Sequence, residues 1–262
     1  MNDRQADRVA LITGAANGIG RATARLLSQE GYAIAALDMQ GQAAQELTDE
    51  LSGDGGDALA VKVDVSDAQD VQQAIRQVDA RWGRLDVVFA NAGINGVWAP
   101  LDELRPEEFD HTVNVNLRGT FLTVKYALPL LRRRGGSIIV TASVNGNRVF
   151  SNTGATAYAC SKAAQVAFVR MIALELAEDD IRVNSICPGP VRTQISQRTE
   201  HRDTEDAGPP VEYPEGTVPL TGGDPARPEE IARLVRFLAG EDASFVSGAN
   251  VYIDGAESLL QG

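Results

Sequence analysis

Short hydrophobic runs alternate along the chain with longer amphipathic segments. Glycine or polar residues bound the runs, which predict seven strands: Val9–Thr13, Ala33–Leu37, Ala58–Val63, Leu85–Ala90, Ser137–Thr141, Arg182–Ile186 and Asn250–Ile253. Between them, hydrophobic residues recur with helical spacing. Strands separated by helices connect through right-handed crossovers into a parallel sheet that is covered on both faces. The pattern therefore predicts an α/β, doubly wound fold with a seven-stranded parallel sheet.

Two helices have boundaries that the sequence indicates. Ser66, followed three residues later by Gln69, has the spacing of a capping box that opens one helix, and Gly83 closes it. The last helix begins around Pro228 and ends at Gly240.

One segment, residues 190–227, breaks this rhythm. It shows no sustained periodicity and is rich in proline. Because it follows the carboxyl end of a strand, where ligand crevices form in such sheets, we expect a substrate lid, with a mobile insertion as the alternative. Apart from this lid, the whole chain, 1–262, is expected to form a single domain.

Composition and charge exclude several classes of function. The formal net charge of −12 and the pI near 4.7 oppose binding to nucleic acid or to an anionic membrane, and no hydrophobic stretch approaches 18 residues. Cys160 and Cys187 lack CxxC spacing, and His111 and His201 lack metal-ligand spacing. We therefore expect a cytoplasmic protein that acts on a small molecule without a metal.

A glycine-rich loop follows the first predicted strand and leads into a helix. It runs from Thr13 to Gly20 and includes Gly14, Asn17, Gly18 and Ile19. Glycines let the backbone turn tightly and approach a pyrophosphate, and the amino end of the helix offers unpaired N–H groups. Together with a strand before it and a helix after it, this loop predicts a dinucleotide site in a Rossmann fold.

Asp38 ends the second strand, where an acidic residue accepts hydrogen bonds from the ribose hydroxyls of NAD. A 2′-phosphate would instead meet a carboxylate, and the neighbouring Met39 and Gln40 supply no cation. We therefore expect NAD rather than NADP. The alternative is that Asp38 is an ordinary cap of the next helix.

Tyr158 and Lys162 are four positions apart in a segment that reads as helix. This spacing advances about 6 Å along the axis and about 40° around it, so both side chains share one face. Removing a proton from an alcohol near neutral pH requires lowering the phenol pKa by roughly 3 units, about 4 kcal/mol. A cation about 4 Å away supplies on the order of 4 kcal/mol, before the opposing cost of desolvation. Tyr158 is thus the candidate base, and Ser143, at the end of the fifth strand, would orient the substrate oxygen.

The ordered motifs of the chain resemble the short-chain dehydrogenase/reductase family, single-domain branch. They are Thr13–Gly20, Asp64–Val65, Asn91–Ala92–Gly93, Asn116–Leu117–Arg118–Gly119, Ser143, Tyr158 with Lys162, and Pro188–Gly189 with Thr193. The resemblance implies the strand order 3-2-1-4-5-6-7 and hydride exchange between a nicotinamide and a carbinol or carbonyl carbon.

The same resemblance implies roles for residues outside the glycine loop. Asp64 and Val65 would flank adenine, and Lys162 would grip the nicotinamide ribose. Asn116 would hold a water that links Lys162 to solvent. Two further sets complete the cofactor site, near the ribose and the carboxamide respectively: Asn91, Ala92 and Gly93, and Pro188, Gly189, Val191 and Thr193.

The fifteen-residue separation of Ser143 and Tyr158 is about two longer than is common in the family. We expect a longer loop beside the pocket, with Ser151 as the nearest competitor of Ser143. Our candidates for substrate contacts are on this loop and after the fourth strand: Asn95, Trp98, Asn145, Arg148, Phe150 and Asn152.

The helix that carries Tyr158 is hydrophobic on almost every side, which indicates a second packing partner beyond its own sheet. We expect self-association through it, and the resemblance implies a tetramer.

The favoured function is an NAD(H)-dependent alcohol dehydrogenase or ketone reductase. Two alternatives stay open: an NADPH-linked carbonyl or acyl-thioester ketoreductase, and a dinucleotide-binding regulator without catalysis.

Overall fold

The computed structural model describes residues 8–205 and 218–261. Seven strands form one parallel sheet in the order β3-β2-β1-β4-β6-β7-β9, which is the predicted order 3-2-1-4-5-6-7 once two short strands outside the sheet are set aside. The sheet strands are β1 (Arg8–Thr13), β2 (Tyr32–Asp38), β3 (Ala58–Lys62), β4 (Val87–Ala90), β6 (Gly136–Thr141), β7 (Ile181–Pro188) and β9 (Asn250–Ile253). The predicted Rossmann-type fold is confirmed.

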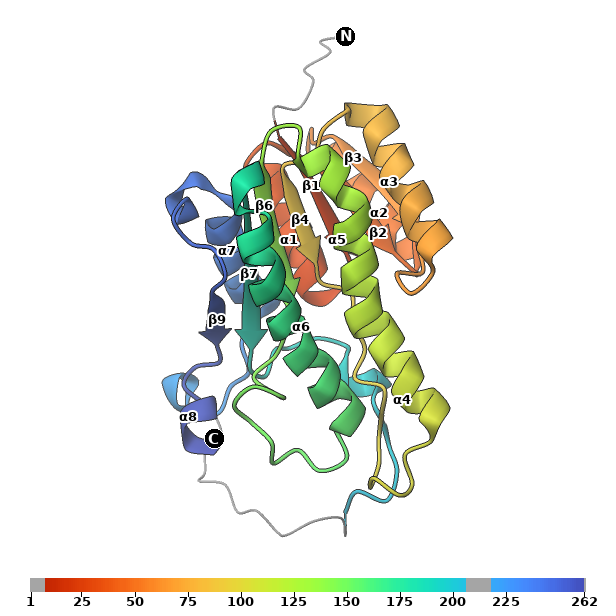
Figure 1. Cartoon of the computed structure of the whole chain (residues 1–262), viewed down its shortest axis with the longest axis vertical. Helices are drawn as coiled ribbons and strands as arrows, with labels where there is room; N and C mark the ends of the chain where they lie inside the picture. The colour runs from red at the N-terminus through yellow and green to blue at the C-terminus, as the bar shows by residue number, and fades with distance from the viewer. Residues whose placement is uncertain (1–7, 206–217, 262) are drawn as a thin grey trace.

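Helices cover both faces of the sheet (Figure 1). They are α1 (Gly18–Gln29), α2 (Gly41–Gly53), α3 (Ala68–Trp82), α4 (Pro106–Val113), α5 (Gly119–Leu131), α6 (Thr156–Glu175), α7 (Pro228–Ala239) and α8 (Ser258–Gln261). A π-helical turn, η1 (Asn114–Arg118), joins α4 to α5, and short 3₁₀ turns lie at Ala177–Asp179, Ser196–Arg198, Pro219–Thr221 and Glu241–Ala243.

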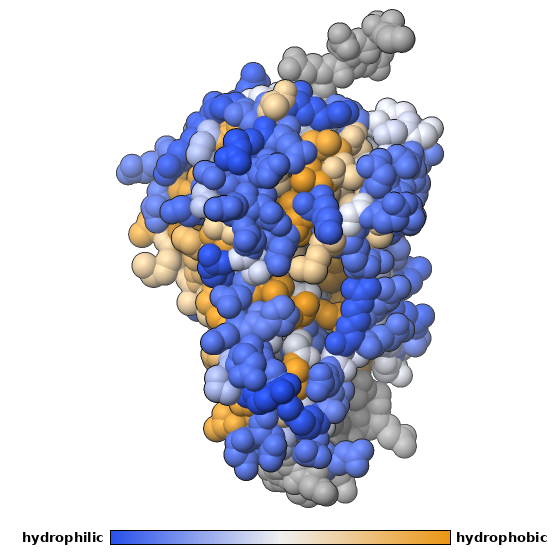
Figure 2. Space-filling view, turned by 90° about the vertical axis from the view of Figure 1, so that its right-hand side faces the viewer, coloured by the Kyte–Doolittle hydropathy of each residue, from blue (hydrophilic) through white to orange (hydrophobic). Residues whose placement is uncertain are grey.

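Alternate residues of the interior strand β1 belong to two hydrophobic cores. Val9 and Leu11 pack with residues of α3, α5 and α6 on one face of the sheet. Ala10 and Ile12 pack with residues of α1, α2 and α7 on the other. Because the side-chain period of a strand is two, a parallel sheet buried on both faces reads as a continuous hydrophobic run. Hydrophilic side chains cover most of the face seen in Figure 2, with several smaller hydrophobic patches among them.

The observed helix boundaries correct one prediction. The N-cap of α3 is Asp67 rather than Ser66, and its carboxylate accepts hydrogen bonds from the backbone N–H of Gln69 at 2.7 Å and of Asp70 at 3.0 Å. The Ser66 hydroxyl donates to Asp64 instead. A carboxylate beside the first helical turn is the stronger acceptor, because it also meets the positive end of the helix dipole. Gly83 ends α3 in the left-handed conformation, as predicted.

The segment expected as a lid contains short elements that the sequence pattern does not reveal. Its strand β8 (Glu200–His201) pairs in parallel with β5 (Val97–Trp98), which follows β4. The predicted lid prolines Pro209, Pro210 and Pro214 lie outside the described residues. The described part up to residue 205 thus lies beside the carboxyl end of the main sheet (Figure 1).

Candidate active site

A cavity of about 790 Å³ lies at the carboxyl ends of the sheet strands. This volume falls within the range of small-molecule sites, and the position is where open α/β sheets bind ligands. Most of the predicted site residues line it: Gly14, Asn17, Gly18, Ile19, Asp38, Met39, Val65, Asn91, Ala92, Gly93, Asn95, Trp98, Ser143, Asn145, Asn152, Tyr158, Lys162, Pro188, Gly189, Val191 and Thr193. Five others lie outside its wall: Gly20, Asp64, Asn116, Arg148 and Phe150.

The glycine loop has the geometry that a bound pyrophosphate requires. Gly14 and Gly18 have φ angles of +66° and +52°, which residues with a Cβ rarely adopt. Asn17, the N-cap of α1, makes no side-chain capping bond, so the first amides of the helix remain for an anion. Gly20 acts through packing, since a Cβ there would lie 2.1 Å from the carbonyl oxygen of Gly14.

Asp38 is held by two backbone amides at the edge of the cavity. One carboxylate oxygen accepts from the N–H of Ala16 at 3.0 Å and the other from the N–H of Gln40 at 2.9 Å. The N-cap of α2 is Gln40, so Asp38 is not the cap of that helix, as the alternative interpretation had it. The two amides fix the orientation of the carboxylate beside the glycine loop.

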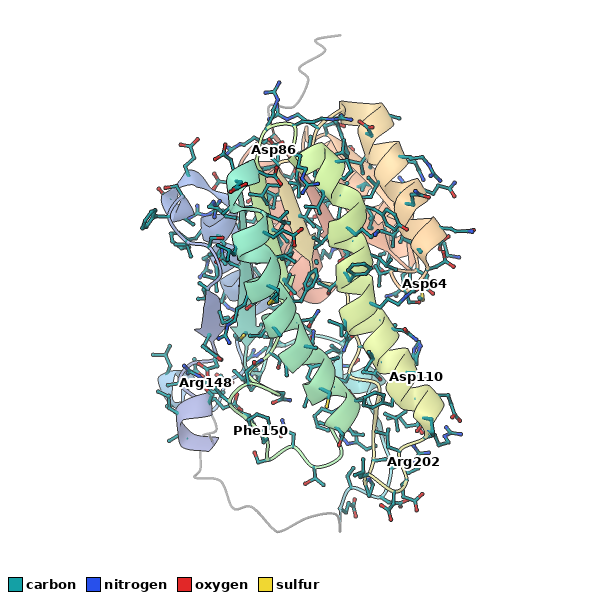
Figure 3. All side chains as sticks on the ribbon, viewed as in Figure 1. Asp64, Asp86, Asp110, Arg148, Phe150 and Arg202 are labelled. Carbon is teal, nitrogen blue, oxygen red and sulfur yellow. The ribbon has the colours of Figure 1, made fainter. Side chains whose placement is uncertain are left out.

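Two residues that the resemblance assigned to the cofactor make contacts within the protein. The Asp64 carboxylate accepts from both the N–H and the hydroxyl of Ser66, and Figure 3 shows it near α3. The Asn91 amide donates to the carbonyl of Thr13 at 3.1 Å and accepts from the Thr141 hydroxyl at 3.1 Å. Asn91 therefore ties the ends of β1, β4 and β6 together beneath the cavity.

Tyr158 lies on the first turn of α6 with Ser143 beside it. Burial raises the pKa of Tyr158 above its usual value near 10, and a hydrogen bond with the Ser143 side chain partly opposes this rise. The Ser143 hydroxyl also accepts from the N–H of Asn145 at 3.1 Å, which fixes its orientation. Burial is thus the largest influence on the Tyr158 pKa, and Lys162, which was expected to lower it, is not among the groups that shift it.

Lys162 is almost fully buried, one helical turn from Tyr158. Its ammonium donates to the carbonyl oxygen of Thr141 at 2.8 Å and lies 5.5 Å from the centre of the Tyr158 ring. Burial lowers the pKa of Lys162 to about 8, because a charged ammonium loses its hydration there. The side chain can therefore exchange a proton close to neutral pH.

Asn116 lies in the π-helical turn, fully buried behind the cavity. Its amide exchanges two hydrogen bonds with the backbone of Ile94 and donates a third to the Ser161 hydroxyl. Gly93 separates it from Lys162: a Cβ on this glycine would lie 3.1 Å from Asn116 Oδ1 and 3.5 Å from Lys162 Nζ. Gly93 thus permits the close approach of both side chains.

Sequence reasoning missed the residue that braces this turn, Gln165. Its side-chain amide donates to the carbonyl of Asn116 at 2.9 Å and to the Thr120 hydroxyl at 2.7 Å. A π-helical turn leaves some backbone carbonyl groups without their usual helical hydrogen bonds. The buried Gln165 amide donates a hydrogen bond to one of them. A glutamine in an otherwise hydrophobic helix was the available signal.

The six predicted substrate contacts divide into two groups. Asn95, Trp98, Asn145 and Asn152 line the cavity. Arg148 instead lies over the Tyr252 ring at 3.6 Å and Phe150 is 74% exposed; Figure 3 shows both on the loop beside α8. The longer loop thus turns these two outward. Ser151 does not line the cavity either.

Other cavity residues were not predicted individually from the sequence. Ile195, Ser196 and Arg198 come from the segment that was expected to form a lid, Glu257 precedes α8, and His111 lies on α4. Arg198 donates to the side-chain oxygen of Gln40 at 3.3 Å. These residues reach the cavity because segments that are distant in sequence fold together, so no local motif predicts them.

Within the described residues, no helix is long and hydrophobic enough to span a membrane. In the same part of the chain, no group of three or more His, Cys, Asp or Glu residues is arranged to hold a metal ion.

A family model described as enoyl-(acyl carrier protein) reductase matches residues 14–256. The chain is 51% identical to a 3-ketoacyl-ACP reductase from Sinorhizobium meliloti 1021, with a TM-score of 0.93 over 96% of this chain and 99% of that one. A 3-ketoacyl-(acyl-carrier-protein) reductase from Brucella melitensis, complexed with NADH, has 28% identity and a TM-score of 0.84 over 96% and 98%. Cyclohexanol dehydrogenase from Acinetobacter sp. (strain SE19) is 34% identical over 98% of this chain and 97% of its own length. With this fold and site, the chain belongs to the short-chain dehydrogenase/reductase family and is an oxidoreductase.

Proposed function

We propose that the protein transfers a hydride between NAD(H) and a small secondary alcohol or ketone, with Tyr158 as acid and base. The observation that carries this proposal is the grouping of Tyr158, Ser143 and Lys162 on one wall of a cavity whose other end is the glycine loop. A bound nicotinamide supplies or accepts the hydride.

The protein's own groups would handle the proton and orient the substrate. Because burial keeps the Tyr158 phenol protonated, it can donate to a carbonyl oxygen as that oxygen gains charge. Ser143, already hydrogen-bonded to Tyr158, would hold the same oxygen. Lys162, with a pKa of about 8, would return a proton toward the phenol side of the cavity.

The choice of NAD rests on Asp38. Its carboxylate is fixed by the N–H groups of Ala16 and Gln40, so a 2′-phosphate would meet a negative charge that cannot turn away. The S. meliloti and B. melitensis reductases are named for ketoacyl substrates, and the latter holds NADH. The Acinetobacter relative is named for an alcohol, so both directions of the reaction are represented.

One observation favours the NADPH-linked alternative. Arg198 reaches Gln40 from the lid, at the same end of the cavity as Asp38, and its guanidinium is the cation that the sequence around Asp38 lacks. Its bonds to Gln40 and Gln194 are both 3.3 Å long and exposed, so we rank it below the fixed carboxylate.

The remaining expectations are also part of the proposal. Met171 and Leu174 on α6 are 75% and 83% exposed, which supports self-association through this helix, as a tetramer. Both cysteines are unpaired, which supports a cytoplasmic location. The acidic charge and the cavity support a small-molecule substrate and the absence of nucleic-acid or membrane partners.

A panel of alcohols and ketones, including cyclohexanol and cyclohexanone, tests the function with each of the two cofactors. We expect turnover that is higher with NAD(H), and a loss of about 100-fold or more in Tyr158→Phe with NADH binding retained. Full turnover of Tyr158→Phe would mean that another group transfers the proton. NADH binding without turnover of any compound would favour the alternative function, a dinucleotide-binding regulator without catalysis.

A further inference from the structure

Trp98 lines the cavity close to Tyr158. The two rings lie 6.5 Å apart, and the other side of Trp98 meets the His201 ring edge-on at 5.3 Å. Trp98 lies on β5 and His201 on β8, so the wall is built from two segments about 100 residues apart. The contacts that hold β8 against β5 therefore help to fix the position of the Trp98 side chain.

We propose that Glu108 and Arg202 form a latch that docks the 196–205 part of the lid on β5 and so positions Trp98 as the substrate-side wall of the active site. This inference deepens the proposed function and rests on it for its catalytic consequence. Neither residue lines the cavity, so both are positioning residues.

Glu108 is a buried carboxylate at the start of α4, and its side chain is only 8% exposed. One oxygen accepts from the Arg105 N–H at 3.0 Å, and the guanidinium of Arg105 contacts the other. Arg105 is the N-cap of α4, and an arginine side chain has no oxygen to cap the helix with. Glu108 thus closes the helix end, and the same carboxylate also reaches the lid.

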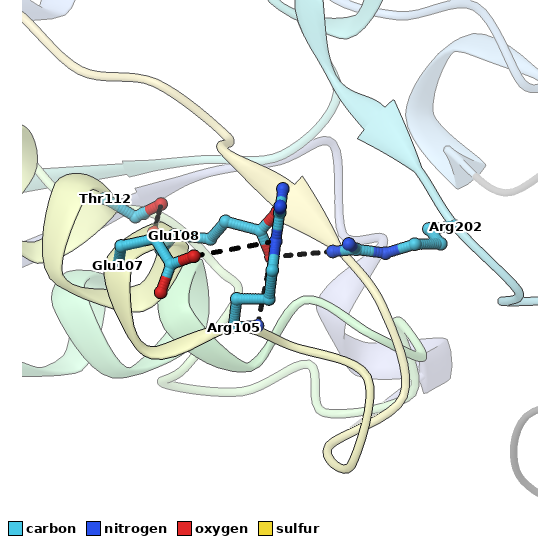
Figure 4. Close-up of polar contacts among 5 residues, drawn as sticks. All are labelled: Arg105, Glu107, Glu108, Thr112 and Arg202. Carbon is cyan, nitrogen blue, oxygen red and sulfur yellow. Dashed lines mark hydrogen bonds and ion pairs between the residues drawn. The ribbon is translucent and has the colours of Figure 1, made fainter.

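Arg202 is fastened to the body of the protein at both ends. Its backbone N–H donates to the carbonyl oxygen of Trp98 at 2.9 Å, which continues the β5–β8 pairing. Its guanidinium donates to Glu108 at 2.6 Å (Figure 4). The side chain is 26% exposed, and its Nε is buried without a hydrogen-bond partner. The contact with Glu108 is therefore what compensates the buried part of this charge.

Further contacts surround the latch and show that β5 has little freedom once the lid is docked. Asn95 donates to the Thr199 hydroxyl at 2.8 Å. On the other side of β5, Ala99 N–H donates to the carbonyl of Gly154 at 3.2 Å. A Cβ at Gly154 would lie 2.7 Å from the backbone nitrogen of Ala99. The loop between Ser143 and Tyr158 and the lid thus both hold the chain around β5.

Removing one member of the latch leaves the other charge partly buried and unpaired. Breaking a buried pair from one side costs much more than losing an exposed pair. The lid offers a matched comparison: Arg192 and Asp224 form an ion pair in which both side chains are more than half exposed. The latch and this exposed pair should therefore differ sharply in their effect on lid docking.

Hydrogen exchange on the full chain with no substrate present tests docking directly. In Arg202→Met, we expect the backbone amide of residue 202 to exchange about tenfold faster or more, because local opening no longer has to break the ion pair. Glu108→Gln should move it in the same direction, and Asp224→Asn should leave it unchanged. An unchanged rate in Arg202→Met, whose α4 is intact, would overturn the latch.

Fluorescence gives an independent reading of the wall. The chain has two tryptophans, so Trp82→Phe leaves Trp98 as the reporter. Quenching of Trp98 by acrylamide should increase on adding Arg202→Met and return toward its original level with Arg202→Lys, which keeps the charge. Equal quenching of Trp98 in Trp82→Phe alone and in Trp82→Phe combined with Arg202→Met or with Arg202→Lys would overturn the proposed positioning.

Kinetics separates this proposal from the function itself. With the compound of the alcohol and ketone panel that turns over fastest, Arg202→Met should raise KM severalfold more than it lowers kcat, with NADH affinity unchanged. If no compound turns over but exchange and quenching change as described, the latch stands and the proposed function fails. A fall in kcat alone with KM unchanged would overturn the positioning role.

Discussion

Asn116 and Ile94 exchange two hydrogen bonds: Asn116 Oδ1 accepts from the Ile94 N–H at 2.8 Å, and Asn116 Nδ2 donates to the Ile94 carbonyl at 2.9 Å. The amide thus pairs with the chain after β4 as a neighbouring strand would. It fastens the π-helical turn to the cavity wall next to Gly93 and Lys162.

Asn116→Ala should therefore destabilise the whole protein as well as reduce turnover. It leaves both backbone groups of Ile94, which are partly buried, without these partners, at a cost of about 3 kcal/mol in the free energy of unfolding. Equilibrium urea unfolding measures this, with Gln73→Ala on the exposed face of α3 as the control. A loss for Asn116→Ala as small as that of the control would contradict the structural role.

Lys162 should make stability rise with pH in a narrow alkaline window. Burial lowers its pKa from 10.5 to about 8, so between these values the unfolded chain holds a proton that the folded chain has released. Stability then increases as pH rises, by about 1 kcal/mol between pH 8 and 9. Burial raises the pKa values of Tyr158 and Cys187, so these groups act in the opposite direction and at higher pH.

Urea unfolding of wild type and Lys162→Met at pH 8 and pH 9 isolates this contribution. The difference in unfolding free energy between the two proteins should shift in favour of wild type as the pH rises. A difference that is the same at both pH values would show that the ammonium is not the group that burial perturbs.

Asp38 should set the preference between the two cofactors. Asp38→Asn keeps an oxygen that can accept from a backbone amide but removes the charge that would oppose a 2′-phosphate. We expect the ratio of kcat/KM for NADH over NADPH to fall by about tenfold or more, the equivalent of about 1.4 kcal/mol.

Asp64→Asn is the matched control for this change. The Asp64 carboxylate also follows a neighbouring strand, but it accepts from Ser66 and does not line the cavity. It should leave the ratio unchanged. An equal shift in both variants would point to a general charge effect rather than a contact with the ribose.

Glu108 should contribute to stability above its unfolded pKa and lose this contribution in acid. Contacts with Arg105 first and Arg202 second lower its pKa from 4.5 to about 2. The lowered pKa means that the contribution is complete above about pH 4.5 and is lost as the pH falls toward 2. Thermal unfolding between pH 6 and pH 3 should show a steeper decline for wild type than for Glu108→Gln.

Glu107→Gln is the control, because Glu107 is the adjacent acidic residue and its side chain is 72% exposed. It should decline with pH as wild type does. If Glu108→Gln declines as steeply as Glu107→Gln, the arginine contacts do not hold the carboxylate in its charged form.

Local patterns were enough to predict the sheet and most of the cofactor end of the cavity. The hydrophobic run of β1 and the glycines that follow it are local patterns in the sequence. A strand that is buried on both faces must be hydrophobic at almost every position, so its pattern can be recognised directly. Tyr158 and Lys162 could be paired for the same reason, since helical geometry alone puts them on one face.

The local sequence did not indicate how deeply each side chain is buried. The pull of Lys162 on Tyr158 could be argued from spacing, but the larger effect of burial comes from the packing of several segments around α6. The same limit applies to Arg148, whose loop position suggested the cavity and whose guanidinium lies on Tyr252 instead.

The sequence by itself therefore determined the fold, the glycine loop and the Tyr158–Lys162 pair, because each depends on periodicity or on residues a few positions apart. Only the tertiary structure decided which polar groups face the cavity, which are buried, and that Glu108 on α4 binds Arg202 of the segment expected to form a lid. Those outcomes depend on contacts between segments up to about 100 residues apart, and hydrophobic burial, which brings such segments together, is non-directional and leaves no local pattern to read.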